Sequence, residues 1–237
     1  MLQWPPDEQQ PPSAQGIKMM ETLTVGVVDA GIGNVAAIVR SMDNLNLSVK
    51  IVQSAEEVRD VNGIILPGVG SYDRGVDALH RSHLWDELTA FSLQPQKSIL
   101  GICLGMQLLC KSSEEGSKKG LGILNAEVLN LSNLTGYCSE HRIPNIGWNY
   151  VTANTSLGTK FLDVCGERQR YYFTHSYYVQ PANADLAVLT CTDHSDLTAA
   201  VIDKNIWGYQ FHPEKSHRFG GAALKNWVEN LRCLSND

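Results

Sequence analysis

The sequence predicts one large α/β domain built on a mostly parallel β-sheet. From residue 24 to residue 102, short apolar runs alternate with amphipathic stretches long enough to form helices. This alternation is typical of βαβ units. Several of the predicted strands also end in glycine-bearing loops, and in open α/β sheets the loops at the carboxyl ends of strands line the ligand site. A chain of 237 residues can bury the core that such a domain needs.

The first half of the chain supplies the parallel strands. Runs rich in Val, Ile and Leu predict strands at 24–28, 49–52, 63–66 and 98–102. Helical periodicity between them predicts helices at 34–46 and 73–91. Three of the strands stop at glycine-bearing loops, at 29–33, 67–70 and 101–105. We therefore expect these three loops to meet at one edge of the sheet.

The pattern changes after Gly120. Further strands of mixed or antiparallel character are predicted at 123–131, 171–179, 186–192, 198–202 and 207–211, and a last helix at 217–234. We assign residues 22–237 to a single domain. Residues 1–21 are rich in Pro and Gln and lack periodicity, so we expect a disordered tail outside the fold.

Charge and cysteine usage narrow the functional class. The net charge of −6 and the pI of about 5.6 leave no cationic surplus for phosphates, so nucleic acid is not expected as a partner. The six cysteines form no C-x-x-C pair, which argues against a zinc site and fits a reducing cytoplasm. No stretch approaches the roughly 20 apolar residues of a membrane span.

Cys103 lies in the sequence Gly-Ile-Cys-Leu-Gly, between a buried strand and an apolar helix. Flanking glycines permit the strained turn of a nucleophile elbow, which would leave Cys103 exposed above the sheet. The helix N-terminus would favour the thiolate, and the backbone N–H of Leu104 would help to hold an oxyanion. The alternative is a buried structural cysteine.

His212 and Glu214 follow the last predicted strand, in the sequence Phe-His-Pro-Glu. A cysteine nucleophile needs a base within hydrogen-bond reach, and the base needs a third group that fixes its ring. Side chains two residues apart point to the same side of an extended segment, and Pro213 stiffens the link. The alternative is a surface His and Glu in a loop. Together with Cys103, the pair predicts a Cys-His-Glu triad.

The motifs P-G-V-G, G-I-C-L-G-M-Q and Q-F-H-P-E-K-S, in this order and at this spacing, resemble the class I (triad) glutamine amidotransferases. The resemblance runs from about Thr24 to the end of the chain. It implies a flavodoxin-like α/β fold with a smaller antiparallel portion. It also implies that Cys103 is the nucleophile, His212 the general base and acid, and Glu214 the orienting carboxylate.

Four further motifs resemble one family within that class, the glutaminase subunits of imidazole glycerol phosphate synthase (the HisH family). They are D-x-G-x-G-N at 29–34, P-G-V-G-S-Y at 67–72, G-W-N at 147–149 and Y-F-T-H-S-Y-Y at 172–178. The resemblance implies hydrolysis of glutamine in the cytoplasm, without metal or cofactor. It further implies a heterodimer with a (β/α)8 barrel cyclase that receives the ammonia in histidine biosynthesis.

The same resemblance assigns the rest of the site. It implies a P-G-V-G element that must reorient to complete the oxyanion hole, and a loop bearing Trp148 and Asn149 that faces the partner. A carboxylate such as Glu115 suits the α-ammonium of glutamine. The alternative for Glu115 on its own is one member of a solvated acidic pair with Glu114. The implied substrate-binding residues are Gly68, Gly70, Leu104, Gln107, Glu115, His175, Ser176 and Tyr177.

One position departs from the family pattern P-H-x-G-W-N: Asn145 stands where the family usually has His. Asn cannot titrate, so the contribution of that His to coupling is in question here. Three alternatives stay open. They are a paralogous amidotransferase that supplies ammonia for amidino-sugar synthesis in a surface polysaccharide, a non-catalytic regulatory subunit, and a stand-alone hydrolase of γ-glutamyl compounds.

Overall fold

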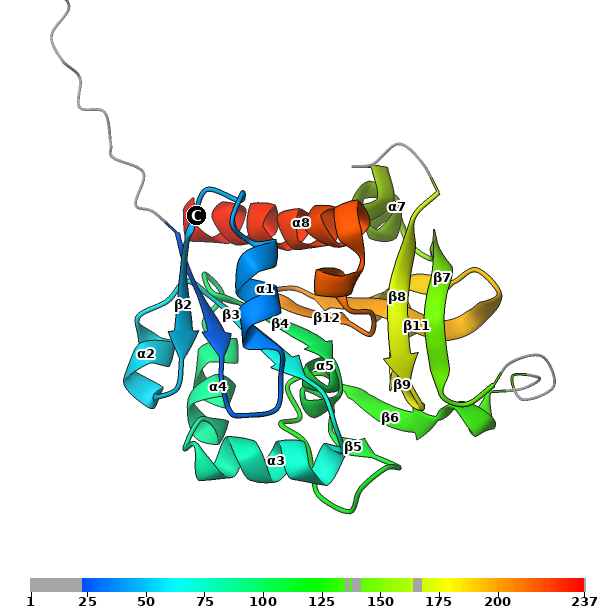
Figure 1. The fold of residues 1–237 in the computed structure, drawn as a ribbon, viewed down its shortest axis with the longest axis horizontal. Helices are drawn as coiled ribbons and strands as arrows, with labels where there is room; N and C mark the ends of the chain where they lie inside the picture. The colour runs from blue at the N-terminus through cyan, green and yellow to red at the C-terminus, as the bar shows by residue number, and fades with distance from the viewer. Residues whose placement is uncertain (1–22, 135–136, 138–141, 164–167, 237) are drawn as a thin grey trace, which may run out of the picture.

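The computed structural model describes residues 23–134, 137, 142–163 and 168–236, and it contains one large sheet and one small sheet (Figure 1). The large sheet has nine strands in the order β2-β1-β3-β4-β12-β11-β10-β7-β8. The small sheet has the order β5-β6-β9. The expected α/β class is confirmed. The tail expected at 1–21 lies outside the described residues.

The parallel half of the large sheet matches the strands predicted from the first half of the chain. Neighbouring strands run parallel from β2 through β1, β3 and β4 to β12. Branched apolar side chains fill these strands, and the whole of β3 and β4 is buried, as expected for strands covered on both faces. The bounds are β1 (Thr24–Val28), β2 (Ser48–Val52), β3 (Gly63–Gly68), β4 (Ser98–Cys103) and β12 (Ile206–Tyr209).

The antiparallel half continues from β12, and every further neighbour runs antiparallel. Its strands are β11 (His194–Asp203), β10 (Ala187–Cys191), β7 (Asn145–Ala153) and β8 (Arg170–His175). The prediction missed β7. It also merged β8 with the next strand, β9 (Tyr177–Pro181), which pairs instead in the small sheet with β6 (Ala126–Asn130). The chain passes from one sheet to the other at Ser176.

Helices cover both faces of the large sheet, as in a doubly wound domain. Side chains that alternate along each strand divide between two apolar clusters, so Val25 and Val27 pack on one face while Val28 packs on the other. On the first face lie α1 (Val35–Ser41), α7 (Ser156–Asp163) and α8 (His217–Asn236). On the second face lie α2 (Ala55–Arg59), α3 (Tyr72–Arg81), α4 (Trp85–Ser92) and α5 (Leu104–Leu108).

The helix predicted at 73–91 is wrong in one respect, because the structure divides it into α3 and α4. The backbone of His83 has φ of +56°, a left-handed conformation that a continuous α-helix cannot contain. The break lets Leu84 and Leu88 bury fully against the second face. The short strand β5 (Ser112–Ser113) and helices α2 and α7 were not predicted; α7 contributes Phe161 to the first cluster.

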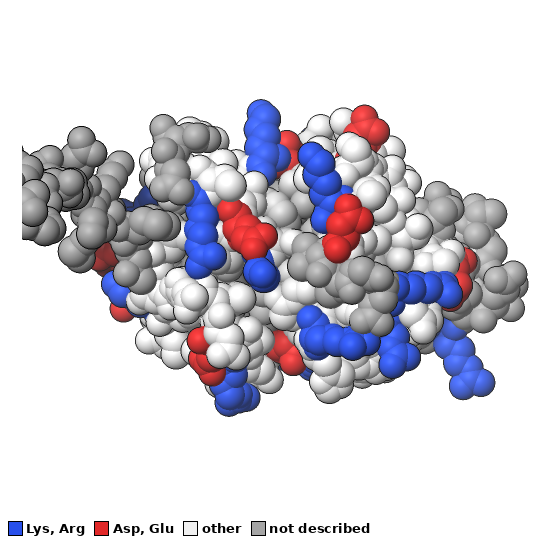
Figure 2. Space-filling model, turned by 90° about the horizontal axis from the view of Figure 1, so that it is seen from above, with Lys and Arg blue, Asp and Glu red and all other residues white. Residues whose placement is uncertain are grey.

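Within the described ranges, no helix is long and apolar enough to cross a membrane. Figure 2 shows the face seen from above in the view of Figure 1, where basic and acidic side chains lie interspersed. This mixture fits the modest net charge of −6.

Candidate active site

Cys103 occupies a strained turn between β4 and α5. Its backbone has φ of 53° and ψ of −112°, which costs a non-glycine residue about 1–3 kcal/mol. Glycines make the turn possible, because a Cβ on Gly105 would lie 1.7 Å from the Leu66 carbonyl oxygen and a Cβ on Gly101 would lie 2.6 Å from the Met106 backbone. A Cβ on Gly68 would meet the Gly105 nitrogen at 2.7 Å. The elbow geometry expected from the sequence is therefore present.

Cys103 is only 6% exposed, so the expectation that it stands exposed above the sheet is wrong. It is reached instead through a pocket of about 290 Å³. Most of the residues that line this pocket were predicted from the sequence as site residues: Gly70, Cys103, Leu104, Gln107, Glu115, His175, Ser176, Tyr177 and His212. The other lining residues are Val69, Pro144 and Thr174. Residues from six separate stretches of the chain therefore meet around one sulfur atom.

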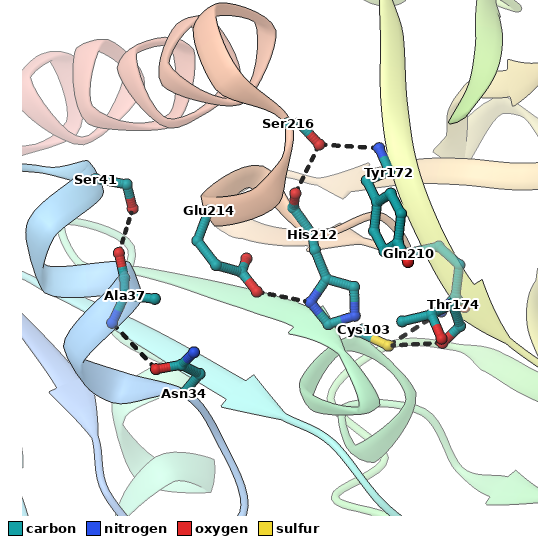
Figure 3. A network of polar contacts seen from close by, with 10 residues as sticks. All are labelled: Asn34, Ala37, Ser41, Cys103, Tyr172, Thr174, Gln210, His212, Glu214 and Ser216. Atoms are coloured by element: carbon teal, nitrogen blue, oxygen red, sulfur yellow. Dashed lines mark hydrogen bonds and ion pairs between the residues drawn. The ribbon is translucent and has the colours of Figure 1, made fainter. Parts of the chain in front are cut away.

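His212 and Glu214 meet beside this sulfur. The Nδ1 atom of His212 lies 2.8 Å from the Glu214 Oε1 atom, and the opposite ring edge faces Cys103 (Figure 3). The expected reason for this proximity is wrong, since Glu214 belongs to a 3-10 turn, η3 (Pro213–Lys215), and not to an extended segment. Such a turn brings the Glu214 side chain back over the His212 ring.

The environment of His212 favours its charged form. Burial alone lowers the pKa of His212, but the Cys103 sulfur and the Glu214 carboxylate outweigh it and raise this pKa from 6.5 to about 9. The backbone around the ring is also fixed: Ser216 Oγ donates to the His212 carbonyl at 2.6 Å, and the His212 N–H donates to the Tyr172 carbonyl at 2.9 Å. Figure 3 shows Ser216 bridging His212 and Tyr172.

The P-G-V-G segment ends β3 at the rim of the pocket. The Val69 N–H donates to the Ile32 carbonyl at 2.5 Å, so the first glycine-bearing loop, at residues 29–33, holds it. Gly70 has φ of +104°, a conformation that favours glycine. The Leu104 N–H lies at the first position of α5, next to Cys103.

Glu115 lies across the pocket, half-buried. Its Oε2 atom accepts the Tyr72 N–H at 3.0 Å, at the start of α3. Burial raises the pKa of the Glu115 carboxyl, the Tyr72 N–H opposes this, and Asp73 adds to the rise. Neighbouring Glu114 points elsewhere and accepts from Asn130 and Asn133. The two glutamates are therefore not a solvated pair, and only Glu115 faces the pocket.

His175 is buried, and its burial keeps the imidazole neutral. Its Nδ1 atom lies 2.8 Å from the Tyr177 carbonyl oxygen, so Nδ1 carries the proton. Its Nε2 atom then accepts from Asn145 Nδ2 at 3.0 Å. Burial, with a smaller contribution from His212, lowers the pKa of His175 to about 4, although the hydrogen bond to the Tyr177 carbonyl opposes the shift. Asn145 thus supplies a donor at the position where the family usually has His.

Gln210 is a polar residue of the site that sequence reasoning missed. It is fully buried just after β12, and its Nε2 atom lies 3.8 Å from the Cys103 sulfur. Its Oε1 atom accepts from Gln107 Nε2 at 3.2 Å. Gln107 therefore touches both the pocket and Gln210. Only the position of Gln210 two residues before His212 could have drawn attention to it.

Trp148 and Asn149 lie on β7, so the expectation of a loop there is wrong. Neither residue lines the pocket. The Trp148 ring is 39% exposed and stacks on His217 with centroids 5.5 Å apart. Exposed Ile146 lies two residues away on the same strand. Asn149 Nδ2 donates to Asn145 Oδ1 at 3.0 Å, which connects this strand to the hydrogen bonds around His175.

No group of three or more His, Cys, Asp or Glu side chains that could hold a metal ion occurs among the described residues. The site brings together a sulfur nucleophile, an imidazole that can carry a proton, an orienting carboxylate and a backbone N–H. Such a set can cleave an amide or ester at its carbonyl carbon through a thioester intermediate.

This fold and site define a class I glutamine amidotransferase domain, and residues 26–230 match the family model described as Glutamine amidotransferase class-I. The structure resembles a solved glutamine amidotransferase with a TM-score of 0.68 at 18% identity, over 87% of this chain and 98% of that one. It also resembles PurLQS from Thermotoga maritima with a TM-score of 0.64 at 19% identity, over 89% and 97% of the two chains. At these identities the likeness concerns the fold.

Sequence relatives narrow the family. The chain is 37% identical over 203 residues to imidazole glycerol phosphate synthase subunit HisH 2 of Pseudomonas aeruginosa, covering 86% of this chain and 98% of that protein. It is 40% identical over 207 residues to subunit HisH 2 of Methanococcus maripaludis and 39% identical over 205 residues to subunit HisH of Leptospira interrogans, with the same coverages. The chain belongs to the HisH family of imidazole glycerol phosphate synthase subunits.

Proposed function

We propose that this chain is the glutaminase subunit of an imidazole glycerol phosphate synthase, which releases ammonia from glutamine and passes it to a cyclase subunit. The observation that carries the proposal is the buried His212–Glu214 pair beside the Cys103 sulfur at the bottom of a pocket. We infer the substrate, glutamine, and the partner, a cyclase subunit, from membership of the HisH family. Residues 22–237 act as one amidotransferase domain in this proposal.

Before glutamine binds, Cys103 has given its proton to His212, whose raised pKa favours the imidazolium. The reaction begins when the sulfur attacks the amide carbon of glutamine. The Leu104 N–H stabilises the negative charge that develops on the amide oxygen. His212 then gives its proton to the departing nitrogen, the C–N bond breaks, and ammonia leaves a glutamyl thioester behind. Water, deprotonated by His212, hydrolyses the thioester to glutamate and restores the thiol. Glu214 holds the ring of His212 throughout.

The remaining pocket residues bind the substrate. Glu115 takes the α-ammonium group, and Gln107, which lines the pocket, takes an N–H of the substrate with its Oε1 atom. The segment from His175 to Tyr177 passes over the bound glutamine head. Gly68 and Gly70 flank the substrate in this proposal. Gly70 lines the pocket and lets the backbone approach the substrate closely, whereas the missing Cβ of Gly68 makes room for the backbone of α5.

The partner acts on this site through the P-G-V-G segment. Hydrolysis without a partner would waste glutamine, and the Val69 N–H is engaged with Ile32 in the free chain. We expect the partner and its ligand to release this hydrogen bond and to turn an N–H toward the oxyanion. Trp148 and Asn149 belong to the partner-facing surface, and in this proposal the partner is a (β/α)8 barrel.

The test mixes the purified chain with a cyclase subunit and follows glutamate release from glutamine, with and without the cyclase's ribonucleotide substrate. Cys103→Ala is the blank. We expect strong stimulation by the complete mixture and none in the blank. High turnover by the isolated chain would contradict the regulatory part of the proposal. Absent stimulation with a cyclase that works on free ammonia would contradict the choice of partner.

Asn145 favours a second candidate, in which the same glutaminase serves a different synthase. The family usually has His at this position, so the coupling to the partner differs here. An enzyme that builds an amidino sugar for a surface polysaccharide would need the same ammonia. A sugar amidotransferase subunit that stimulates glutamate release where the cyclase does not would establish this alternative.

A further inference from the structure

One backbone carbonyl sets the direction of a chain of hydrogen bonds that ends at the nucleophile. The Tyr177 oxygen can only accept, and two side-chain nitrogens approach it: His175 Nδ1 at 2.8 Å and Gln107 Nε2 at 3.1 Å. A carbonyl oxygen has two lone pairs, so these two donors saturate it. The orientation of the Gln107 carboxamide is thereby fixed, with its NH₂ group toward Tyr177.

The orientation of the Gln107 carboxamide also fixes the orientation of the Gln210 carboxamide. Gln107 Nε2 also lies 3.2 Å from Gln210 Oε1, so its second hydrogen is donated there. Because that contact requires an acceptor, the Gln210 carboxamide must present oxygen to Gln107 and nitrogen to the other side. The other side is the Cys103 sulfur, at 3.8 Å. Gln210 is fully buried, and its backbone N–H donates to the Ala199 carbonyl. The backbone from which the Gln210 side chain extends is therefore held in place.

We propose that Gln210 is a further catalytic residue, which donates a hydrogen bond to the Cys103 thiolate when the sulfur gives its proton to His212. This inference rests on the proposed function, in which Cys103 is the nucleophile. An N–H donor stabilises a thiolate more than a thiol. The Thr174 carbonyl, 4.0 Å from the sulfur, accepts the S–H of the neutral thiol and offers the thiolate nothing. Gln210 therefore favours the reactive form.

The test measures how fast iodoacetamide alkylates Cys103 in the full chain, by mass spectrometry of the peptide that contains it. Exposed Cys233 on α8 is an internal reference in the same sample. Gln210→Met keeps an unbranched side chain of similar length but has no donor. Gln210→Glu keeps the acceptor toward Gln107 and places an oxygen against the sulfur. Gln169→Met is the matched control, since Gln169 is a buried amide that bonds Leu162 and Tyr171 and does not line the pocket.

We expect the rate at Cys103, relative to Cys233, to fall about tenfold or more in Gln210→Met and further in Gln210→Glu, as for the loss of a hydrogen bond to a charged group. Gln169→Met should alkylate Cys103 at the wild-type rate. With the partner present, the kcat for glutamate release should fall in the Gln210 variants while the KM for glutamine changes little. A rate at Cys103 within twofold of the wild type, in a Gln210 variant with the wild-type melting temperature, would overturn the inference.

The two variants protect the test against misfolding. If Gln210→Met does not fold, Gln210→Glu, which has nearly the same volume as glutamine, decides by the same criterion. Alkylation needs neither glutamine nor a partner, so it separates the two proposals. Wild-type chain that hydrolyses no glutamine with any partner contradicts the proposed function, whereas unchanged alkylation of the Gln210 variants contradicts only the role of Gln210.

Discussion

The Nδ1 atom of His212 lies 2.8 Å from the Oε1 atom of Glu214, and the two side chains are 2% and 4% exposed. With Cys103, this contact raises the pKa of His212 to about 9 although burial opposes it. A raised pKa means that the imidazolium is present below pH 9 and is lost above it. We predict that glutamate release by the complex declines as the pH rises through about 9, because His212 can then no longer protonate the leaving ammonia.

The variant Glu214→Gln checks this assignment. It removes the negative charge, so the pKa of His212 should fall and the alkaline decline should begin at a lower pH. The kcat should fall about 10²–10⁴-fold, as for a general acid that loses its orienting group. A full pH–rate profile of both proteins is the measurement. An unchanged position of the alkaline decline in Glu214→Gln would show that His212 does not control it.

Gly105→Ala should prevent the elbow from forming. A Cβ at this position would lie 1.7 Å from the Leu66 carbonyl oxygen, a rigid backbone atom. We expect the free energy of unfolding to fall by about 3 kcal/mol or more, at the severe end of overpacking. Thermal and urea unfolding measure it. The matched control is Gly221→Ala in α8, where a Cβ meets nothing within 4 Å, and it should stabilise the fold by about 1 kcal/mol. Equal effects of both would contradict the argument.

Glu115→Gln should weaken substrate binding. The carboxylate faces the pocket, where the α-ammonium of glutamine needs a negative partner. We expect the KM for glutamine to rise about tenfold or more, with a much smaller change in kcat. Steady-state kinetics of the stimulated complex measure both. The control is Glu114→Gln, which removes the same charge one residue earlier, outside the pocket. An equal rise of KM in Glu114→Gln would show that the net charge of the region, and not a contact of Glu115 with the substrate, sets the affinity.

Asn145→Asp should change the protonation of His175. At neutral pH His175 is neutral, because burial lowers its pKa to about 4. An aspartate would accept a proton from Nε2, and an opposite charge at this distance raises a pKa by about 1–3 units. NMR titration of the imidazole nitrogens reports the change. A midpoint for His175 that does not move would contradict the contact of 3.0 Å between Asn145 and His175.

Trp148→Ala should weaken the complex with the partner. The ring is 39% exposed although it stacks on His217 and lies 5.4 Å from the Arg170 guanidinium, so it is a rigid apolar surface already ordered for docking. We expect an affinity loss of about 2 kcal/mol, or roughly thirtyfold, as for an interface anchor. Calorimetric titration with the cyclase measures it. Leu157→Ala, an exposed apolar residue on α7, is the control and should leave the affinity unchanged.

Local signals in the sequence sufficed for the parallel half of the fold and for the elbow. The strand predicted at 24–28 is the observed β1, because a run of apolar residues buried on both faces needs no partner information. Gly101 and Gly105 likewise announce a turn that only glycine neighbours permit. The proximity of His212 to Cys103 was predicted from the need of a cysteine nucleophile for a base and from the resemblance to the class I amidotransferases.

Long-range contacts account for what the sequence left out. β7 was missed because only Asn145 and Val151 of its nine residues are buried, so the strand carries a weak apolar signal. The break at His83 depends on where Leu84 packs. Gln210 reads as an ordinary strand residue, and its role becomes visible only when Gln107 and Cys103, more than 100 positions earlier in the chain, lie beside it.

The placement of Ser176 between β8 of the large sheet and β9 of the small sheet has a mechanical consequence. A single residue joins the two sheets there, and that residue lines the pocket. Any twist of one sheet against the other must be absorbed by the backbone torsions of Ser176 and its neighbours. The shape of the pocket therefore depends on the angle between the two sheets. A displacement of the edge strand β8 would move Ser176, and with it the wall of the pocket beside the proposed glutamine site.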